Sequence, residues 1–432
     1  MPRAATWLPE AGPSHRPLRF LLGAFGDPGH TFPVIALGRE LVRRGHEVTI
    51  ETWKRWEEAA VAEGMAFAPS PEYHVFPTRE RPLKPYEAVA RAALVSREVV
   101  RSVRPDVVVA DILTLAPALA GELEEVPVAT LIPHVHPVTP SGWPPYSIGA
   151  RLPRRAAGRA LWRMTEPVVR GGLERGRSEL NETRRRLGLP PLDHVHGGIS
   201  HSLCMVGTFP QLEYPRRWEP WEHVVGPLLW EQPFGEVELP PGDAPLVLVA
   251  PSTSQDPSHR LLRAAVEGLA GEDVRVLAAT NRRPLPSPID VPANTRLVDW
   301  VSYARTMPRC DVVVCHGGHG TVARALASGC AVVVVPAAGD MNENGARVDW
   351  AGVGVRLPRR LATPGAVRLA VRAALADIRL RARARELAAW SAEHDGAVRS
   401  AGLVEQLAQR TRASRAATLA VPMLPAASRT TA

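Results

Sequence analysis

Short apolar runs alternate with helical patterns along the chain, and this alternation predicts an α/β protein. Runs of β-branched residues bounded by Gly, Pro or Asp are typical of buried parallel strands. In the first half, the expected strands cover 18–23, 47–52, 104–111, 126–132 and 202–206. In the second half, they cover 246–250, 274–280, 296–299, 311–315, 331–335 and 353–357. Apolar residues at helical spacing follow many of these runs, so each half predicts a doubly wound, Rossmann-like sheet.

Shifts in composition divide the chain further. The stretch after residue 224 is rich in Pro and Gly and then turns acidic, which marks a domain linker. The N-terminal residues combine Arg and Pro without an apolar segment, and the C-terminal residues are rich in Ala, Thr and Pro, so both ends are expected to be disordered. The expected segments are a leader, a first domain, the linker, a second domain, a last helix and a tail, at 1–17, 18–224, 225–244, 245–396, 397–410 and 411–432.

The totals describe a globular protein of two or three domains. The chain has 432 residues, of which 45% are hydrophobic, and its mean hydropathy is −0.09. The longest apolar runs are far shorter than the roughly 20 residues of a membrane span. The net charge of +8 raises the question of nucleic-acid binding, but the arginines are scattered among acidic residues along helical stretches. We interpret them as solvated helix faces, with a minor role in attracting an anionic substrate.

The four cysteines lie in or beside apolar runs and lack CxxC spacing: Cys204, Cys310, Cys315 and Cys330. Buried free thiols in a reducing cytoplasm are the expected state, so we predict a cytoplasmic location. His134-x-His136 suggests a metal site, but no matched Cys or carboxylate ligands accompany it at a known spacing. The chain also lacks a DxD motif, and we expect neither a metal nor another cofactor.

The stretch 311–344 predicts a complete phosphate-binding unit. A buried strand leads into His316-Gly-Gly-His-Gly320, whose glycines permit close approach of the backbone to a ligand. Thr321 is a plausible N-cap or first-turn residue of the following helix, and a second strand follows. Such a unit presents backbone N–H groups and a positive helix end to an anion. Asp340 and Asn344 come just after the second strand, where open sheets bind ligands.

In the N-terminal half, a glycine loop at the carboxyl end of the first strand delivers His30 to the start of a helix. The GxxGH spacing does not fit a dinucleotide fingerprint. A histidine in such a place is by itself more often a surface or packing residue. Asp111 ends another strand, where the simplest interpretation is a helix N-cap.

The ordered set HGGxGTxxxAL, Gly329, Pro336, Asp340 and Asn344 resembles the nucleotide-sugar signature of family 1 GT-B glycosyltransferases, and the chain looks like their bacterial natural-product type, which acts on antibiotics, macrolides and polyketides. The resemblance covers residues from about 18 to 410. It implies two Rossmann-like domains with a ligand cleft between them, and a last helix that crosses back to the first domain. GHxxP at 29–33 is similar to the loop that holds the general base of these enzymes.

The resemblance also assigns roles to residues. His30 would be the base and Asp111 the carboxylate that orients it, because a carboxylate stabilises the imidazolium formed on proton transfer. Trp300 would stack on uracil or thymine, although Ser302 and Tyr303 replace the Pro and the Gln or His that commonly follow. The expected acceptor contacts are His134 and Trp143. The expected donor-binding residues are Ser252, Thr253, Trp300, Val301, His316, Gly317, Gly318, Gly320, Thr321, Asp340, Met341 and Asn344.

Met341 departs from the family pattern, which commonly has Asp-Gln where this chain has Asp340-Met341. A buried amide left beside a missing hydroxyl would cost about 1–3 kcal/mol, so an apolar residue suits a sugar that lacks that hydroxyl. The hypothesis is an inverting transfer of a deoxyhexose from a dTDP- or UDP-sugar to a hydroxyl of a small lipophilic natural product, by a monomer or homodimer. The alternatives are a nucleotide-sugar epimerase on the same fold, a non-catalytic nucleotide-sugar-binding partner of another transferase and, third, a nucleic-acid binder.

Overall fold

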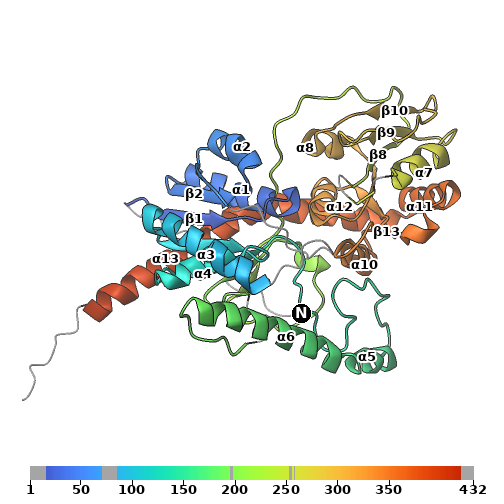
Figure 1. Ribbon diagram of the computed structural model, residues 1–432. Helices are drawn as coiled ribbons and strands as arrows, with labels where there is room; N and C mark the ends of the chain where they lie inside the picture. Colours follow the sequence, from blue (N-terminus) through green and yellow to red (C-terminus); the bar gives the residue numbers. More distant parts are fainter. Residues whose placement is uncertain (1–15, 71–84, 195–197, 253–254, 257, 420–432) are drawn as a thin grey trace, which may run out of the picture.

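The computed structural model describes residues 16–70, 85–194, 198–252, 255–256 and 258–419. Two parallel sheets organise this part of the chain (Figure 1). The first has the order β3-β2-β1-β4-β5-β6-β7, and the second has the order β10-β9-β8-β11-β12-β13. The predicted pair of doubly wound sheets is therefore confirmed. In both sheets the strand order reverses beside a central strand, β1 in the first and β8 in the second, and ligands bind at such points.

The strands of the first sheet are β1 Arg19–Gly23, β2 Glu47–Thr52, β3 Ala66–Pro69, β4 Val107–Asp111, β5 Val128–Ile132, β6 Cys204–Val206 and β7 Glu222–Val224. Those of the second sheet are β8 Leu246–Ala250, β9 Arg275–Ala279, β10 Thr295–Val298, β11 Val312–Cys315, β12 Ala331–Val334 and β13 Gly354–Arg356. The sequence pattern missed β3 and β7. Both are short edge strands, and the Glu-His-Val sequence of β7 has no apolar alternation.

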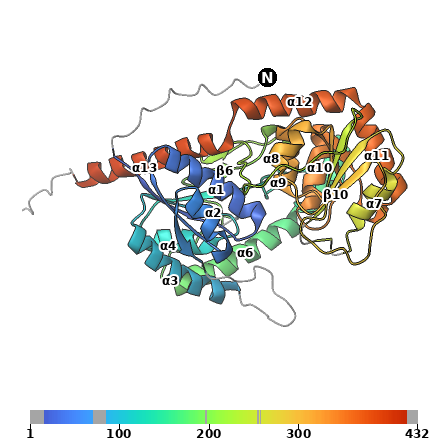
Figure 2. The ribbon, with the colours of Figure 1, turned by 90° about the horizontal axis from the view of Figure 1, so that it is seen from above.

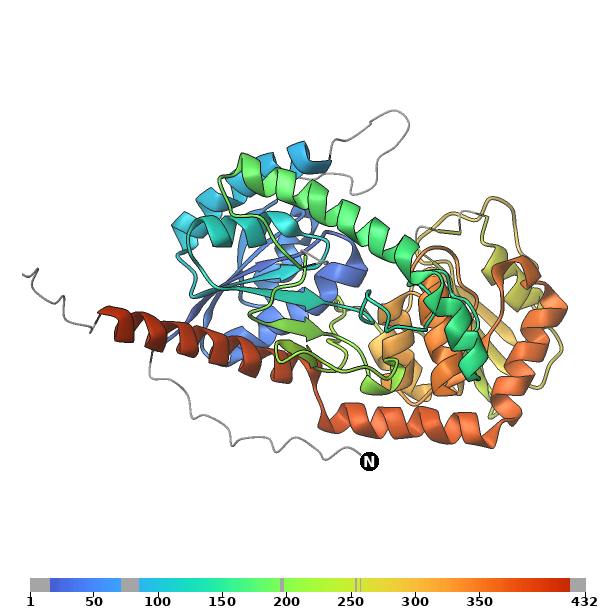
Figure 3. The same cartoon turned by 90° about the horizontal axis from the view of Figure 1, so that it is seen from below.

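The α-helices of the first half are α1 Pro28–Arg43, α2 Glu57–Ala62, α3 Pro85–Val103, α4 Leu115–Leu123, α5 Ala156–Arg163 and α6 Glu166–Arg186. Those of the second half are α7 Arg260–Gly268, α8 Tyr303–Thr306, α9 His319–Ala327, α10 Met341–Ala351, α11 Pro364–Ala376, α12 Ile378–Glu393 and α13 Gly396–Leu419. In Figures 1 and 3, α5 lies beside the second domain, and α6 runs from there back to the first domain.

Alternating side chains of the central strands build a separate core on each face of each sheet. Phe20 and Leu22 of β1 pack with α1 and α13, whereas Leu21 packs with α3 and α4 on the opposite face. In the second sheet, Leu248 belongs to the core with α9 and α12, and Val249 to the core with α7 and α11. Because both faces are covered, the strands are almost continuously apolar, as expected of parallel sheets.

The last two helices, α12 and α13, connect the two halves of the molecule. α12 packs on α9 in the second domain, and α13 then lies along the first domain beside α1 (Figures 1 and 2). The helix continues to Leu419, beyond the predicted end at residue 410, because Ala and Arg favour helix and Arg412 pairs with Asp106 at 2.7 Å. The predicted leader up to residue 15 and the tail from residue 420 lie outside the described residues.

Candidate active site

A histidine and an aspartate meet at the switch point of the first sheet. His30 lies in the first turn of α1, directly after β1, and Asp111 is the last residue of the neighbouring strand β4. His30 Nδ1 is 2.8 Å from Asp111 Oδ2. The other carboxylate oxygen, Oδ1, accepts a hydrogen bond from the Leu113 backbone N–H at 2.9 Å. Because Asp111 is fully buried and held at both oxygens, it fixes the imidazole, and Nε2 is the ring nitrogen that faces away from the pair.

The environment of His30 makes it a stronger base than an ordinary histidine. Burial alone would lower its pKa, but the charge of Asp111 and the hydrogen bond to it raise the pKa above the usual value. Asp340 and Asp27 add smaller contributions in the same direction. Asp340 follows β12 of the second sheet, so residues of both domains act on this one imidazole.

His134 and Tyr146 lie beside His30. The His134 ring centroid is 5.8 Å from that of His30, and Tyr146 is stacked on the other ring at 6.2 Å. The Nδ1–H of His134 donates to the Val135 carbonyl at 2.8 Å. Burial, followed by the charge of His30, lowers the pKa of His134, which keeps it neutral. His134 therefore lies where the sequence predicted an acceptor contact, next to the candidate base.

Trp143 has a different environment. Its ring is stacked on Tyr214, with centroids 4.8 Å apart and an interplanar angle of 8°, and the edge of Trp350 on α10 lies 5.3 Å away. These contacts make Trp143 a packing residue between the two domains. The family resemblance implied an acceptor contact for this loop, but the sequence could not reveal the two aromatic partners of Trp143, which are distant in the chain.

Arg347 of α10 joins the domains by a buried charge cluster that the sequence did not reveal. Its guanidinium is within 2.8 Å of Glu343 and 3.1 Å of Glu213, and it lies over the Tyr214 ring at 3.3 Å. Burial lowers the pKa of Arg347, but Glu213, Tyr214 and Glu343 outweigh that effect and raise it. Glu213 also accepts from the backbone N–H of His136, so α10 is tied to the loop that carries His134.

The glycine loop of the second sheet, residues 316–320, has a backbone that a ligand can approach closely. Gly317 has a φ of +87°, and a Cβ at this position would lie 2.9 Å from Val334. Gly318 is the N-cap of α9, and a Cβ there would lie 2.5 Å from Nε2 of His316. At Gly320, by contrast, a Cβ would meet no described atom within 4 Å, so this backbone faces open space. Thr321 is in the first turn of α9, as predicted.

His316 is neutral in the absence of a ligand. Its Nδ1 is 3.3 Å from the Ala250 carbonyl, which can only accept, so Nδ1 carries a proton. Burial lowers the pKa of His316, and this outweighs the opposing effects of the Ala250 bond, Asp340 and Asp256. The neutral ring therefore presents a lone pair at Nε2. It must take up a second proton before it can donate a hydrogen bond to a phosphate.

Asn344 supports the glycine loop from behind. Its side-chain N–H donates to the Gly317 carbonyl at 2.9 Å, and its Oδ1 is 3.4 Å from Nδ1 of His319. Asn344 is 3% exposed, and its amide contacts protein groups, whereas the family resemblance implied a contact with phosphate. Asp340 is the N-cap of α10 and makes no side-chain cap bond within the described residues, which leaves its carboxylate available. Met341 is partly exposed beside it.

Trp300 forms a small aromatic and cationic cluster with two residues that the sequence did not reveal. The Arg282 guanidinium lies 4.8 Å from the Trp300 ring centroid and 5.4 Å from that of Phe234, a residue of the linker. Glu231, also in the linker, accepts from the backbone N–H groups of Tyr303 and Ala304 at 2.8 and 2.7 Å. It therefore holds the loop after Trp300 in place. Val301 is buried, 1% exposed.

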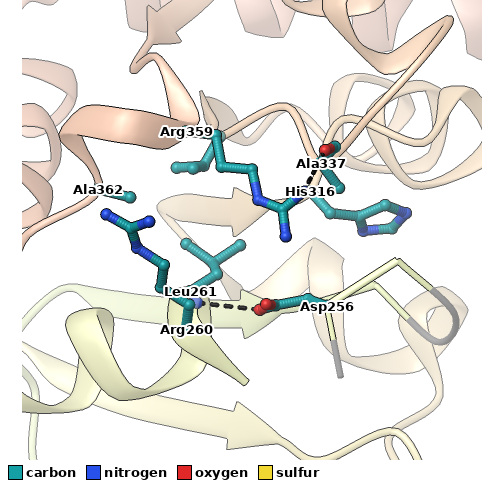
Figure 4. A pocket seen from close by; sticks show the side chains of 8 residues that line it. Asp256, Arg260, Leu261, His316, Ala337, Arg359 and Ala362 are labelled. Atoms are coloured by element: carbon teal, nitrogen blue, oxygen red, sulfur yellow. Dashed lines mark hydrogen bonds between the residues drawn. The ribbon is translucent and has the colours of Figure 1, made fainter. Parts of the chain in front are cut away.

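A small cavity opens beside His316 (Figure 4). Asp256, Arg260 and Arg359 line it together with apolar side chains. Arg359 donates to the Ala337 carbonyl at 2.7 Å, and Asp256 accepts from the backbone N–H of Leu261 at 3.0 Å. The two arginines make this side of the loop positive, which suits an anionic ligand. In the nearby loop, Ser252 accepts from the Gln255 N–H at 2.9 Å, whereas the predicted ligand Thr253 lies outside the described residues.

Known proteins resemble this chain over most of its length. Residues 263–397 match the model of the C-terminal domain of erythromycin biosynthesis protein CIII-like proteins. The 4'-demethylrebeccamycin synthase of Lentzea aerocolonigenes is 29% identical over 428 residues, which cover 90% of this chain and 99% of that protein. The O-mycaminosyltylonolide 6-deoxyallosyltransferase of Streptomyces fradiae is 32% identical over 252 residues, 54% of this chain and 57% of that protein.

Solved structures show the same fold. The kitacinnamycin glycosyltransferase has a TM-score of 0.73 at 23% identity and covers 91% of this chain and 99% of its own. The glycosyltransferase VinC, solved with dTDP, has a TM-score of 0.67 at 18% identity and covers 91% of this chain and 100% of its own. The fold and the relatives together define a GT-B glycosyltransferase. The predicted resemblance to the natural-product type of these enzymes is therefore confirmed. No helix in the described ranges is long and apolar enough to cross a membrane.

Proposed function

We propose that this enzyme transfers a deoxyhexose, with inversion, from a dTDP- or UDP-sugar to a hydroxyl of a small lipophilic natural product. The observation that carries this proposal is the buried His30–Asp111 pair at 2.8 Å. The charge of Asp340, in the second domain, also raises the pKa of His30. A base fixed by a buried carboxylate, beside the sugar end of the donor site, is what activation of an acceptor hydroxyl requires.

The reaction balances without a metal ion. Nε2 of His30 takes the proton of the acceptor hydroxyl as its oxygen attacks the anomeric carbon, and the bond from that carbon to the diphosphate oxygen breaks. The attack comes from the face opposite the leaving group, so the configuration inverts. Negative charge then grows on the nucleoside diphosphate. The N-terminus of α9 and a protonated His316 would stabilise that charge.

The donor assignment rests on Trp300, on Met341 and on the relatives. Trp300 is a partly exposed aromatic suited to stacking on a pyrimidine. Two solved relatives were determined with thymidine diphosphate, and one relative by sequence is a 6-deoxyallosyltransferase. Met341 cannot hydrogen-bond a hydroxyl as an amide would. These facts favour a dTDP-deoxysugar over a fully hydroxylated donor.

The test is transfer from a panel of dTDP- and UDP-sugars to hydroxylated aromatic and macrolide acceptors, with the product anomer determined by NMR. Retention of configuration would contradict the proposal. Binding of donors without transfer or hydrolysis would favour a non-catalytic partner, and full turnover by His30→Ala would favour an epimerase. In the same panel, Met341→Gln should gain activity with a fully hydroxylated donor, and no gain would argue against the deoxysugar.

A further inference from the structure

A second cavity, in the first domain, contains polar atoms that the proposed reaction does not use. It lies beyond the carboxyl ends of β1, β2 and β4, and its walls include Phe25, Glu51, Trp53, Ser70 and Thr114. The remaining lining residues are alanines and a proline. Glu51, Ser70 and Thr114 thus bring a carboxyl group and two hydroxyl groups to a lining that is otherwise largely apolar.

Glu51 is only 1% exposed, yet half of its carboxyl group is unpaired. Oε1 accepts from the Ser96 hydroxyl at 2.5 Å, whereas Oε2 has no hydrogen-bond partner among the described residues. A buried polar atom without a partner is destabilising, so its presence in a fold requires an explanation. A ligand group that enters the cavity and donates a hydrogen bond to Oε2 would explain why this atom has no partner in the protein.

Thr114 shows the same feature. Threonine at a helix N-cap normally accepts from the first turn of the helix. Thr114 is the N-cap of α4, but its hydroxyl makes no cap bond and has no partner within the described part of the chain. The backbone N–H of Thr114 donates to the Asp111 carbonyl at 2.8 Å, which places the cavity next to the catalytic pair.

Phe25 connects the cavity to the candidate base. Its ring contacts His30 edge to face at 6.0 Å and Trp53 at 5.2 Å. A ligand whose hydroxyl approaches His30 can therefore extend along Phe25 towards Glu51. The cavity lies on the acceptor side of the site, because the donor-binding loops all belong to the second sheet.

The unpaired atoms define the chemistry of the ligand. Oε2 of an ionised Glu51 accepts, and the Thr114 hydroxyl can accept as well as donate; a protonated amine has enough hydrogens to donate to both, whereas a ligand hydroxyl has one. Burial raises the pKa of Glu51 to about 7, against the smaller opposing effect of the Ser96 hydrogen bond. A cation in the cavity would stabilise the ionised carboxylate, so a protonated amine and Glu51 would form an ion pair.

We propose that this cavity is a subsite for a basic nitrogen of the acceptor, with Glu51 and Thr114 as its hydrogen-bond acceptors and Phe25 and Trp53 as its apolar wall. The proposal rests on the proposed function, since it takes the substrate of His30 to be the ligand. It narrows the acceptor class to hydroxylated compounds that carry an amine at a fixed distance from the reacting hydroxyl.

Matched phenols test the subsite. Tyramine and longer ω-aminoalkyl phenols are compared with alkyl phenols of equal length, and their binding to the dTDP-saturated protein is measured by calorimetry. At one chain length the amine should bind at least tenfold more tightly than its alkyl partner. Glu51→Gln should remove this preference while dTDP affinity and melting temperature stay unchanged. Glu58→Gln, an exposed glutamate on α2, should retain the preference.

Two results would overturn the proposal. One is a wild-type protein that shows no amine preference at any length, a result that needs no folded variant. The other is a preference that survives in Glu51→Gln. Ser96→Ala, which frees the second oxygen of Glu51, should keep the preference and so separates the carboxyl group from its structural hydrogen bond. Because binding is measured without turnover, an amine preference in a protein that transfers no sugar would contradict the proposed function and leave the subsite intact.

Discussion

A histidine lies after a central strand in each of the two sheets, His30 after β1 and His316 after β11. His30 faces a buried carboxylate at 2.8 Å, and its pKa is raised although burial opposes this. His316 faces a backbone carbonyl at 3.3 Å, and burial lowers its pKa. Both histidines lie at the switch point of a sheet, yet one is a strengthened base and the other is a neutral imidazole.

The partner of each histidine accounts for this difference. A carboxylate stabilises the imidazolium and so prepares a ring to receive a proton. A carbonyl fixes the tautomer but contributes no full charge, so the proton on the second nitrogen must be stabilised by the ligand itself. A histidine that faces a carbonyl is suited to an anionic ligand, and one that faces a carboxylate is suited to taking a proton from a hydroxyl, as we propose for His30. Variants that exchange or remove these partners test the comparison.

Removal of the base should have the largest effect. His30→Asn cannot accept the acceptor proton at neutral pH, and general base catalysis typically contributes about 10²–10⁴-fold, so kcat should fall by roughly that factor. Affinity for dTDP, measured by calorimetry, should stay within about twofold, because the His30 side chain belongs to the other domain. A large loss of dTDP affinity would show that His30 also contributes to donor binding, which the comparison assigns to the domain of His316.

Loss of the carboxylate charge should have a smaller effect and change the pH profile. His30 must be neutral to act, so activity is lost as pH falls below its pKa. Asp111 raises that pKa, and Asp111→Asn should therefore move the acidic limb of kcat/KM to lower pH. The plateau should fall by roughly 10–100-fold, because the imidazole is then a weaker base and its imidazolium is no longer stabilised by a carboxylate. An acidic limb at unchanged pH would contradict the assignment of the base.

The pH dependence of donor binding should report on His316. Its pKa is low in the free protein and should rise on binding of a diphosphate, so binding takes up a proton and weakens as pH increases through the bound-state pKa. Between pH 7 and 9, affinity for a dTDP-hexose should fall by up to about tenfold per pH unit, which is ~1.4 kcal/mol. His316→Gln should bind more weakly and show a flat profile.

His30→Asn is the control for that experiment, because it keeps His316 intact and should retain the slope. A flat wild-type profile, measured by calorimetry in buffers of different ionisation enthalpy, would mean that His316 binds the phosphate without a proton.

The sequence predicted the parts of this site that depend on local order along the chain. The strand–loop–helix units, the glycines and the ends of β1 and β4 are all set by neighbouring residues, and so His30, Asp111 and His316 could be found. The Arg347–Glu213 cluster, the stacking of Trp143 on Tyr214 and the Glu231 cap join residues far apart in sequence. A single chain carries no pattern for such pairs. Short edge strands such as β7 were missed because three polar or mixed residues show no periodicity.

The smallest effect is expected at Gly320, where one substitution should raise the stability of the free protein and lower its affinity for dTDP. A Cβ there meets no described atom within 4 Å, and alanine is favoured over glycine in a helix by up to ~1 kcal/mol, so Gly320→Ala should raise the melting temperature of the free protein slightly. If a diphosphate lies against this backbone, the same methyl group weakens dTDP binding. Gly318→Ala is the matched variant, because its Cβ would lie 2.5 Å from His316 Nε2 and should lower affinity without the gain in stability. Unchanged dTDP affinity in Gly320→Ala would place the phosphate elsewhere, nearer the arginines that line the cavity beside His316.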